Sequence, residues 1–361
     1  MNAGGAETFL MKVYRALDKT KYQMDFAVAV KDEGYYDKEI LANGGKIYRI
    51  TPKSDGAFKN FNEIKRLVKE NGYNYVLRTS QHSLSAMELL AAKKGGAKVR
   101  VFRSSNSDTV SQSKKQRLLH KLFSFMPKRY ANVKIAPSTE AANFMFGKKS
   151  VERGDVFLLK NAVDLEYFKF CRIGRDEIRK QFGVEDDCVL VGHIGRFSTQ
   201  KNHSYLLEIF KKIHSLNQKT KLMLVGKGEL EQKIKAKVSD LGLSDSVIFT
   251  GVRSDIPSIL SAMDVFLFPS LYEGMPNTVI EAQATGLPCV ISDTITGEAD
   301  ITGLVKYLSL HDTVDSWAKE TLCVACNDDR LSVKEKFIEM HYDIESTVKD
   351  FVKLVFNEEK E

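Results

Sequence analysis

Short apolar segments alternate with amphipathic segments along almost the whole chain, and this alternation is the strongest constraint on the fold. Residues 189–192 and 265–268 are apolar throughout, as is typical of parallel strands covered on both faces. Alternating strands and helices predict an α/β protein with doubly wound parallel sheets. The expected strands are residues 24–30, 46–50, 74–77, 98–102 and 132–136 in the first half, and 188–194, 221–225, 246–250, 264–268 and 288–291 in the second.

The length of the chain and a break in the alternation indicate two domains. A chain of 361 residues is long enough for two cores, and residues 160–172 interrupt the strand–helix rhythm. We expect a Rossmann-like domain over 1–160, a second over 161–341, and a helix within 342–361 that packs back on the first. Open α/β sheets bind ligands at the carboxyl ends of their strands. Two facing domains would therefore place a site in the cleft between them.

The start of the sequence predicts a missing element. A Gly-Gly turn at Gly4 and Gly5 stands where a doubly wound domain normally has a central strand before it. We expect a strand of about 6–10 residues to precede it in the natural product. The start shows neither a basic leader nor an apolar stretch, and no apolar run reaches the ~18 residues of a membrane span. Together with five cysteines, an odd number, this predicts a cytoplasmic protein with reduced thiols.

Positive charge is concentrated in one region. Residues 93–153 hold 15 Lys and Arg against three acidic residues, whereas the whole chain has a net charge of only +7. Such a region favours an anionic partner, but it carries no nucleic-acid motif. Two interpretations of the segment 113–126 remain open: a helix on the inner face of an anionic membrane, or a surface helix whose apolar stripe faces the core. The stripe consists of Leu118, Leu119, Leu122 and Phe123.

Two strands of the second half end in glycine-containing turns. The strand 188–194 is followed by Gly195 and Arg196, with Lys201 five residues later. Glycine allows close approach of the backbone, and two cations suit a diphosphate. The next strand is followed by Gly226 and Gly228. Each segment taken alone is also compatible with a simple turn.

A pair of glutamates follows another strand of the second half. Phe268 ends the strand, and Pro276 is a favoured first residue of a helix. Glu273 then lies in the loop and Glu281 inside the helix. Carboxylates accept hydrogen bonds from sugar hydroxyls, while the amides of residues 274–278 would form a positive helix terminus that suits phosphate. With the cations of the preceding paragraph, these features predict a nucleotide-sugar site.

These motifs together resemble those of the retaining glycosyltransferases of family 4, which have the GT-B fold of two facing Rossmann-like domains, and more narrowly the bacterial capsular and exopolysaccharide group. The resemblance extends from residues 4–7 through 161–168 to 342–344, and the Glu-x7-Glu pair in its Tyr-Glu-Gly-Met-Pro-Asn setting is specific. It implies transfer of a sugar from a nucleotide-sugar, a UDP-sugar, to a lipid-linked or growing polysaccharide acceptor. The alternatives are a nucleotide-sugar-binding module with weak or lost catalysis and a GT-B-fold sugar-nucleotide epimerase, against which the Glu-x7-Glu setting argues.

The resemblance also implies roles for particular residues. Arg196 and Lys201 would bind the donor diphosphate and stabilise the leaving nucleotide, Glu273 would hold hydroxyls of the donor sugar, and Glu281 the ribose. No metal or other cofactor is expected, because the two cations take the place of a metal. The donor side would comprise Gly195, Gly226, Val252, Arg253, Gly274, Met275, Pro276, Asn277, Thr278 and Glu281, and the acceptor side Gly4, Gly5, Arg78 and His82.

One departure from the related enzymes adds a catalytic candidate. Those enzymes carry a His-Ser-His-Asn-like run after the strand that corresponds to 99–102, where this chain has Arg103-Ser-Ser-Asn. Arg103 would contact a phosphate or another anionic group of a substrate. The alternative is that Arg103 and Arg78 only pair with acidic side chains. The single Cys-x-x-Cys at 323–326 is expected to be structural, since a zinc site needs a second pair of ligands.

Overall fold

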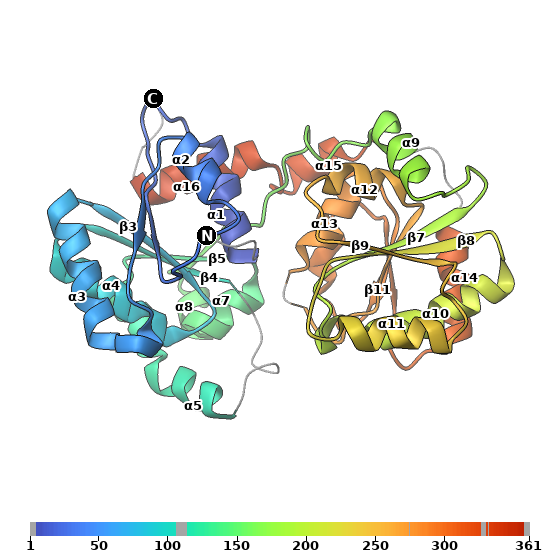
Figure 1. The fold of residues 1–361 in the computed structure, drawn as a ribbon. Helices are drawn as coiled ribbons and strands as arrows, with labels where there is room; N and C mark the ends of the chain where they lie inside the picture. The colour runs from blue at the N-terminus through green and yellow to red at the C-terminus, as the bar shows by residue number, and fades with distance from the viewer. Residues whose placement is uncertain (1–4, 106–113, 274, 326–329, 331, 357–361) are drawn as a thin grey trace. The chain divides into compact units, whose positions relative to one another are not determined.

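The chain divides into two compact units, each an α/β structure built on parallel strands (Figure 1). The computed structural model describes residues 5–105, 114–273, 275–325, 330 and 332–356. Unit 1 comprises Met1–Ala162 and His341–Glu361, and unit 2 comprises Val163–Met340. The chain therefore passes from unit 1 to unit 2 and returns to unit 1 for its last helix.

Unit 2 contains a six-stranded sheet in which all neighbouring strands are parallel. Its strands are β7 (Val189–Ile194), β8 (Thr220–Val225), β9 (Val247–Gly251), β10 (Val265–Phe268), β11 (Cys289–Ser292) and β12 (Val305–Leu308). Their order in space is β12-β11-β10-β7-β8-β9. The strand order reverses between β7 and β10, so the carboxyl ends of these two strands form the topological switch point at which doubly wound sheets bind ligands.

Helices cover both faces of this sheet (Figure 1). The helices of unit 2 are α9 (Arg172–Gln181), α10 (His203–Leu216), α11 (Glu231–Asp240), α12 (Ile256–Ala262), α13 (Asn277–Ala284), α14 (Val314–Val324) and α15 (Lys334–Glu339), with short 3-10 turns η2 (Thr199–Lys201) and η3 (Gly297–Ala299). Alternate residues of the central strands, such as Val191 and Val265, pack with Phe210 and with Trp317, the single tryptophan, under α10, α11 and α14. The strands are apolar on both faces because both faces are covered.

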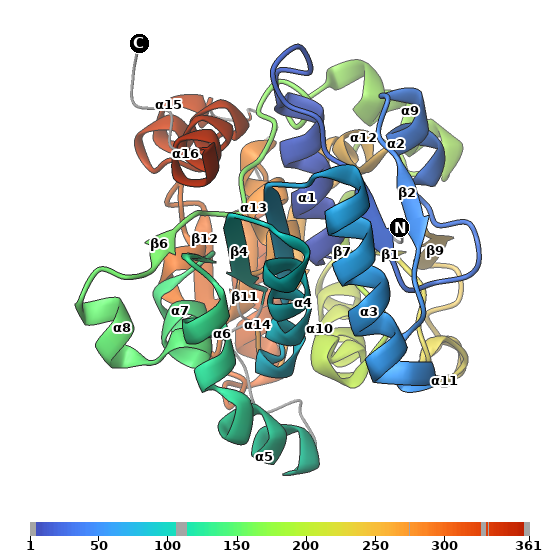
Figure 2. The same ribbon diagram turned by 90° about the vertical axis from the view of Figure 1, so that its left-hand side faces the viewer.

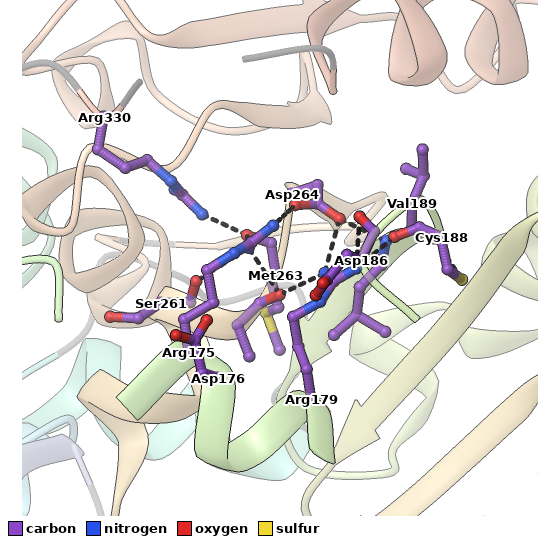
Figure 3. Close-up of polar contacts among 12 residues, drawn as sticks. Arg175, Asp176, Arg179, Asp186, Cys188, Val189, Ser261, Met263, Asp264 and Arg330 are labelled. Carbon is purple, nitrogen blue, oxygen red and sulfur yellow. Dashed lines mark hydrogen bonds and ion pairs between the residues drawn. The ribbon is translucent and has the colours of Figure 1, made fainter. Parts of the chain in front are cut away.

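Two buried arginines attach α9 to the amino ends of β7 and β10 (Figure 3). Arg175 Nη2 donates to Asp264 Oδ1 at 2.7 Å, and Arg179 Nη1 donates to Asp264 Oδ2 at 3.2 Å. The backbone N–H of Leu190 donates to the same Oδ2 at 2.7 Å. Arg175 also donates to backbone carbonyls at the end of α12, among them the carbonyl of Ala262 at 3.0 Å. This network lies at the sheet edge opposite the switch point.

Unit 1 contains two separate parallel sheets, β1-β2 and β3-β4-β5-β6. Its elements are α1 (Gly5–Ala16), β1 (Phe26–Val28), α2 (Asp37–Ala42), β2 (Ile47–Arg49), α3 (Lys53–Asn71), β3 (Tyr75–Ser80), η1 (Ser83–Ala86), α4 (Met87–Gly95), β4 (Val99–Ser104), α5 (Lys114–Phe123), α6 (Phe125–Tyr130), β5 (Val133–Ala136), α7 (Thr139–Phe146), α8 (Lys148–Glu152), β6 (Phe157–Leu158) and α16 (Ile344–Phe356). Among the described residues, no ladder joins β1 to β3. The strand that we expect to precede Gly4 and Gly5 in the natural product stays a prediction.

The two faces of the larger sheet of unit 1 carry different helices. Helices α1 and α16 pack on one face, around Phe9, Val101 and Ile135. Helices α4, α6 and α7 contribute to a second core around Phe102 and Phe146 on the other face. Successive residues of β4 therefore point alternately into one core and the other. Helix α5 lies at one end of unit 1 in both views (Figures 1 and 2).

Several element boundaries differ from the sequence prediction. Strands β3 and β4 continue to Ser80 and Ser104, so Arg78 and Arg103 lie within strands and not after them. Neighbouring strands pair through backbone hydrogen bonds, so a polar side chain such as that of Arg78 or Arg103 does not end a strand. Strands β6 and β12 were not predicted, and helix α13 begins at Asn277, one residue later than expected.

Among the residues that the structure describes, no helix combines the length and the apolar composition that crossing a bilayer requires.

Candidate active site

The switch point of unit 2 brings together a cation and a carboxylate that the sequence separates by 72 residues. Lys201 lies in η2, after β7, and its Nζ is 2.7 Å from Oε1 of Glu273, in the loop after β10. The two side chains are 15% and 10% exposed. The ring of Phe268 supports the ammonium, whose Nζ is 4.3 Å from the ring centroid. The pair can therefore offer both a positive charge and a hydrogen-bond acceptor to a ligand at the strand ends.

A glutamine adjacent to this pair connects the two loops. The backbone N–H of Leu271 donates to the carbonyl of Gln200 at 2.9 Å, and Gln200 Nε2 donates to the carbonyl of Tyr272 at 2.9 Å. Gln200 thereby holds the segment before Glu273 against η2. The sequence prediction missed this residue, and its only signal is its position beside Lys201. Its side-chain amide donates while its backbone carbonyl accepts, so one residue contacts both Tyr272 and Leu271.

The loops after β7 and β8 touch through their backbones. At Gly226, where φ is +133°, an added Cβ would lie 2.1 Å from the carbonyl oxygen of Gly195. At Gly228 it would lie 2.4 Å from the carbonyl oxygen of Phe197. Glycine is thus required at these positions by close approach, not only by turn formation. The contact fixes the course of the loop that leads from Gly195 to Lys201.

Replacing Gly226 by alanine tests this contact. We expect the free energy of unfolding of unit 2 to fall by about 2–4 kcal/mol, because backbone strain and a steric clash add together. Gly242→Ala is the matched control: Gly242 also has a positive φ, +71°, but nothing lies within 4 Å of its Cβ position. The control should lose about 1 kcal/mol. Equal losses in urea titrations of both variants would contradict the close-approach argument.

Two neutral histidines lie beneath the lysine. His193 Nδ1 is 2.9 Å from the carbonyl oxygen of Leu267, and since a carbonyl only accepts, Nδ1 carries the proton. The ring centroids of His193 and His203 are 4.8 Å apart. Burial lowers the pKa of His193 well below its ordinary value, and burial and Lys201 lower the pKa of His203 to about 4. The unfolded chain would take up protons from about pH 6.5 downward, so this pair makes the fold less stable as the pH falls.

The other predicted donor-side cations already have protein partners. Arg196 is 73% exposed, and its Nε is 3.2 Å from Oε2 of Glu229. Arg253 donates to both carboxylate oxygens of Asp255, at 2.9 and 2.6 Å, and Val252 beside it is 64% exposed. A ligand at these positions would have to share or displace these carboxylates. The other predicted donor-side residues are near the start of α13. Two of them precede the helix, Met275 and Pro276, and three lie on it, Asn277, Thr278 and Glu281. Gly274 lies outside the described residues.

The predicted acceptor-side residues occupy unit 1 and are not equivalent. Arg78 Nε is 2.5 Å from Oε2 of Glu88, as in the alternative that an acidic side chain occupies it. His82 is half-buried at the start of η1, and burial, followed by the nearby charges, lowers its pKa. Gly5 is the first residue of α1, and Gly4 lies outside the described residues. Arg103 is 2% exposed within β4 and donates through Nη2 to Asn161 Oδ1.

Comparison with known sequences identifies relatives. Residues 174–319 match the family described as glycosyl transferases group 1. EpsF of Bacillus subtilis, a protein named as a glycosyltransferase, is 35% identical over 354 residues, which cover 96% of this chain and 92% of EpsF. The Escherichia coli UDP-Gal:alpha-D-GlcNAc-diphosphoundecaprenol alpha-1,3-galactosyltransferase is 29% identical over 239 residues, which cover 65% of this chain and 62% of that protein.

Comparison with solved structures concerns the fold. Anabaena HepE in complex with UDP and glucose superimposes with a TM-score of 0.78 at 16% identity, covering 99% of this chain and 98% of HepE. A glycosyltransferase from Rickettsia africae superimposes with a TM-score of 0.76 at 16% identity, covering 98% and 95%. The predicted fold class is confirmed as GT-B. Sequence and fold together therefore show that this chain belongs to the group 1 glycosyl transferases, the family 4 proteins with the GT-B fold.

Proposed function

We propose that this chain moves a sugar from a UDP-sugar to a lipid-linked or growing polysaccharide acceptor in exopolysaccharide or capsule synthesis. The observation that carries the proposal is the Lys201–Glu273 pair at the switch point of unit 2. The names of the relatives support its finer parts: one contains UDP-Gal and a diphosphoundecaprenol acceptor, and a solved structural neighbour was studied with UDP and glucose.

The proposed chemistry depends on charge. Breaking the bond between the anomeric carbon and the phosphate oxygen leaves an oxocarbenium-like sugar and an anionic nucleoside diphosphate. Lys201 and Arg196 would stabilise that leaving group, as preorganised cations do. An ammonium has three N–H donors, so Lys201 can keep its bond to Glu273 while it donates to a phosphate. Glu273 would in turn accept hydrogen bonds from hydroxyls of the donor sugar.

The remaining parts of the proposal concern stereochemistry and cofactors. Retention would follow from attack of the acceptor hydroxyl on the face from which the nucleotide leaves, with the hydroxyl proton passing to the departing phosphate oxygen as the new carbon–oxygen bond forms. The two cations would supply the charge that a divalent metal ion supplies in other enzymes. Glu281 would bind the ribose, and the loop of Val252 and Arg253 would lie against the base.

A donor screen tests the proposed function. The full chain is incubated with a panel of UDP-sugars and bacterial membrane extract, and mass spectrometry follows the products. We expect one UDP-sugar to yield UDP and a glycosylated lipid or oligosaccharide of unchanged anomeric configuration by NMR, with full activity in EDTA. Release of an epimerised free sugar, or UDP-sugar binding without turnover, would contradict transfer. Loss of activity in EDTA that Mg²⁺ restores would contradict metal independence.

We further propose that α5 attaches unit 1 to an anionic membrane surface, where a lipid-linked acceptor resides. Leu118 and Leu122 are each 59% exposed, and Phe125 just after the helix is 51% exposed. Phe123 instead packs against a core cluster of unit 1, so the predicted stripe is divided between the core and the surface. Exposed leucines within the basic region 93–153 are a combination typical of interfacial helices.

Vesicle flotation tests this attachment. In low salt, Leu118→Ser/Leu122→Ser is expected to lower partitioning onto phosphatidylglycerol vesicles about tenfold or more, because each leucine loses its apolar transfer energy. Leu216→Ser is the matched control, since Leu216 is a 47% exposed leucine at the end of α10 in unit 2. Binding to purely zwitterionic vesicles should be weaker, as the charge term would be absent. Unchanged partitioning of the double variant would disprove the role of α5.

A further inference from the structure

Arg103 is a buried cation that has no counter-charge among the residues that the structure describes. It lies in β4 on the same face as Val99 and Val101, which belong to the core under α1 and α16. The guanidinium group therefore follows two apolar side chains on this face of the strand. Phe9 covers it, with Cζ 3.7 Å from the ring centroid. Among the described residues, no carboxylate lies within ion-pair distance of Arg103. Burial accordingly lowers its pKa to about 9, and no neighbouring charge opposes that effect.

Most of the hydrogen-bonding capacity of this guanidinium is unused. Of its five N–H groups, one donates to Asn161 Oδ1, and the buried Nε has no hydrogen-bond partner in the described part of the chain. The other two buried arginines of the described chain differ in the partners of their guanidinium groups, although Arg179 Nε is also unpartnered. Arg175 and Arg179 share Asp264, and each also donates to at least three backbone carbonyls. Those two have structural partners that Arg103 lacks.

A second unpartnered donor lies beside Arg103. Thr79 of β3 is its register partner, so the two side chains project on the same face from neighbouring strands about 5 Å apart. Thr79 Oγ1 is buried and has no hydrogen-bond partner among the described residues. Both positions lie at the carboxyl ends of parallel strands, the edge at which such sheets bind ligands. A guanidinium can only donate, so the group that would satisfy this corner is an anion with several acceptor oxygens.

We infer that Arg103, Thr79 and Asn161 form a binding site for a phosphate group of a sugar-transfer substrate. This inference rests on the proposed function, and it adds a second anion site, in unit 1, to the one at Lys201. Two N–H groups of a planar guanidinium can donate in parallel to two oxygens of one phosphate. The phosphate belongs either to the donor diphosphate or to the diphosphate of a lipid-linked acceptor, and both present the same oxygens.

Calorimetric titration of the full chain with inorganic pyrophosphate tests the site. The titration uses Lys201→Ala as the background, so that the site at Lys201 does not contribute. Adding Arg103→Met is expected to weaken pyrophosphate binding at least tenfold while the melting temperature stays equal or rises, since methionine needs no counter-charge. Arg103→Lys should bind with intermediate affinity, because the charge remains and the planar fork is lost. Unchanged pyrophosphate affinity, or a lowered melting temperature with unchanged affinity, would make Arg103 structural and overturn the inference.

Two further measurements complete the test. If Arg103→Met does not fold, Thr79→Val replaces it, because valine keeps the shape and removes the hydroxyl; a loss of pyrophosphate affinity supports the site, and no loss overturns it. UDP affinity separates the two sources: if Arg103→Met lowers it, the phosphate is the donor's, and if only the KM for the acceptor rises, it is the acceptor's. If the proposed function itself is wrong, Lys201→Ala will leave the affinity for UDP unchanged.

Discussion

Lys201→Ala is expected to lower kcat for sugar transfer about 10²–10³-fold, because a preorganised charge that stabilises a leaving group contributes on this scale. UDP affinity should fall as well, since the ammonium would contact the diphosphate before and after transfer. The removal also leaves Glu273, which is 10% exposed, without its partner. Steady-state kinetics with the donor from the screen, together with UDP titration, measure both effects.

Lys219→Ala is the matched control for this result. Lys219 forms an ion pair with Asp187 in the same unit, but it immediately precedes β8 and so lies at the amino edge of the sheet. Its removal is expected to leave kcat and UDP affinity unchanged. If Lys201→Ala behaved like Lys219→Ala, the switch point would not be the site of transfer. If Glu273→Gln left transfer unaffected, the role of the carboxylate would be wrong while that of the cation could stand.

Asp264→Leu is expected to lower the free energy of unfolding of unit 2 by about 3–5 kcal/mol, the usual cost of removing one partner from a buried charge network. The substitution removes the carboxylate that Arg175 and Arg179, 7% and 3% exposed, share (Figure 3). Trp317 is the single tryptophan and is fully buried in unit 2. Its fluorescence in urea titrations therefore reports on this unit separately from unit 1.

Two comparison variants sharpen this measurement. Asp187→Ala removes an acid whose partner Lys219 is 67% exposed, and it should not change the urea midpoint detectably. Replacing Arg175 and Arg179 by methionine in the Asp264→Leu background should recover most of the stability, since an apolar replacement of a whole buried network is often neutral. An Asp264→Leu variant as stable as the natural chain would show that the network carries no net stabilisation.

Local pattern was sufficient to predict the α/β fold class. Strands β7, β8 and β10 were predicted to within a residue or two, because parallel strands covered on both faces are continuously apolar. Strand β6 was missed because it spans only Phe157–Leu158, and both of its residues are exposed. Strand β12 was missed for a similar reason, since Leu308 is its only buried residue. Short or solvent-facing strands leave no hydrophobic signal in a single sequence.

The site could be predicted in composition but not in its contacts. Glycine and cations after β7 and a glutamate after β10 indicate which residues face the same edge of a parallel sheet. No local pattern announces that Gln200 joins the two loops, or that the carbonyl of Gly195 leaves no room for a Cβ at Gly226. These contacts depend on strand order, which brings together residues that are distant along the chain.

Arg78 and Arg103 illustrate where sequence reasoning ends. Both stand near the end of an apolar strand, and the same two readings, anion contact or acidic partner, applied to each. In the folded chain Arg78 meets Glu88 of α4, whereas Arg103 meets Phe9 and Asn161 and no acid among the described residues. Periodicity establishes strands, helices and the edge where chemistry occurs, because it reflects local burial. Whether a charge is neutralised depends on which distant helix covers it, and that emerges only when the layers pack.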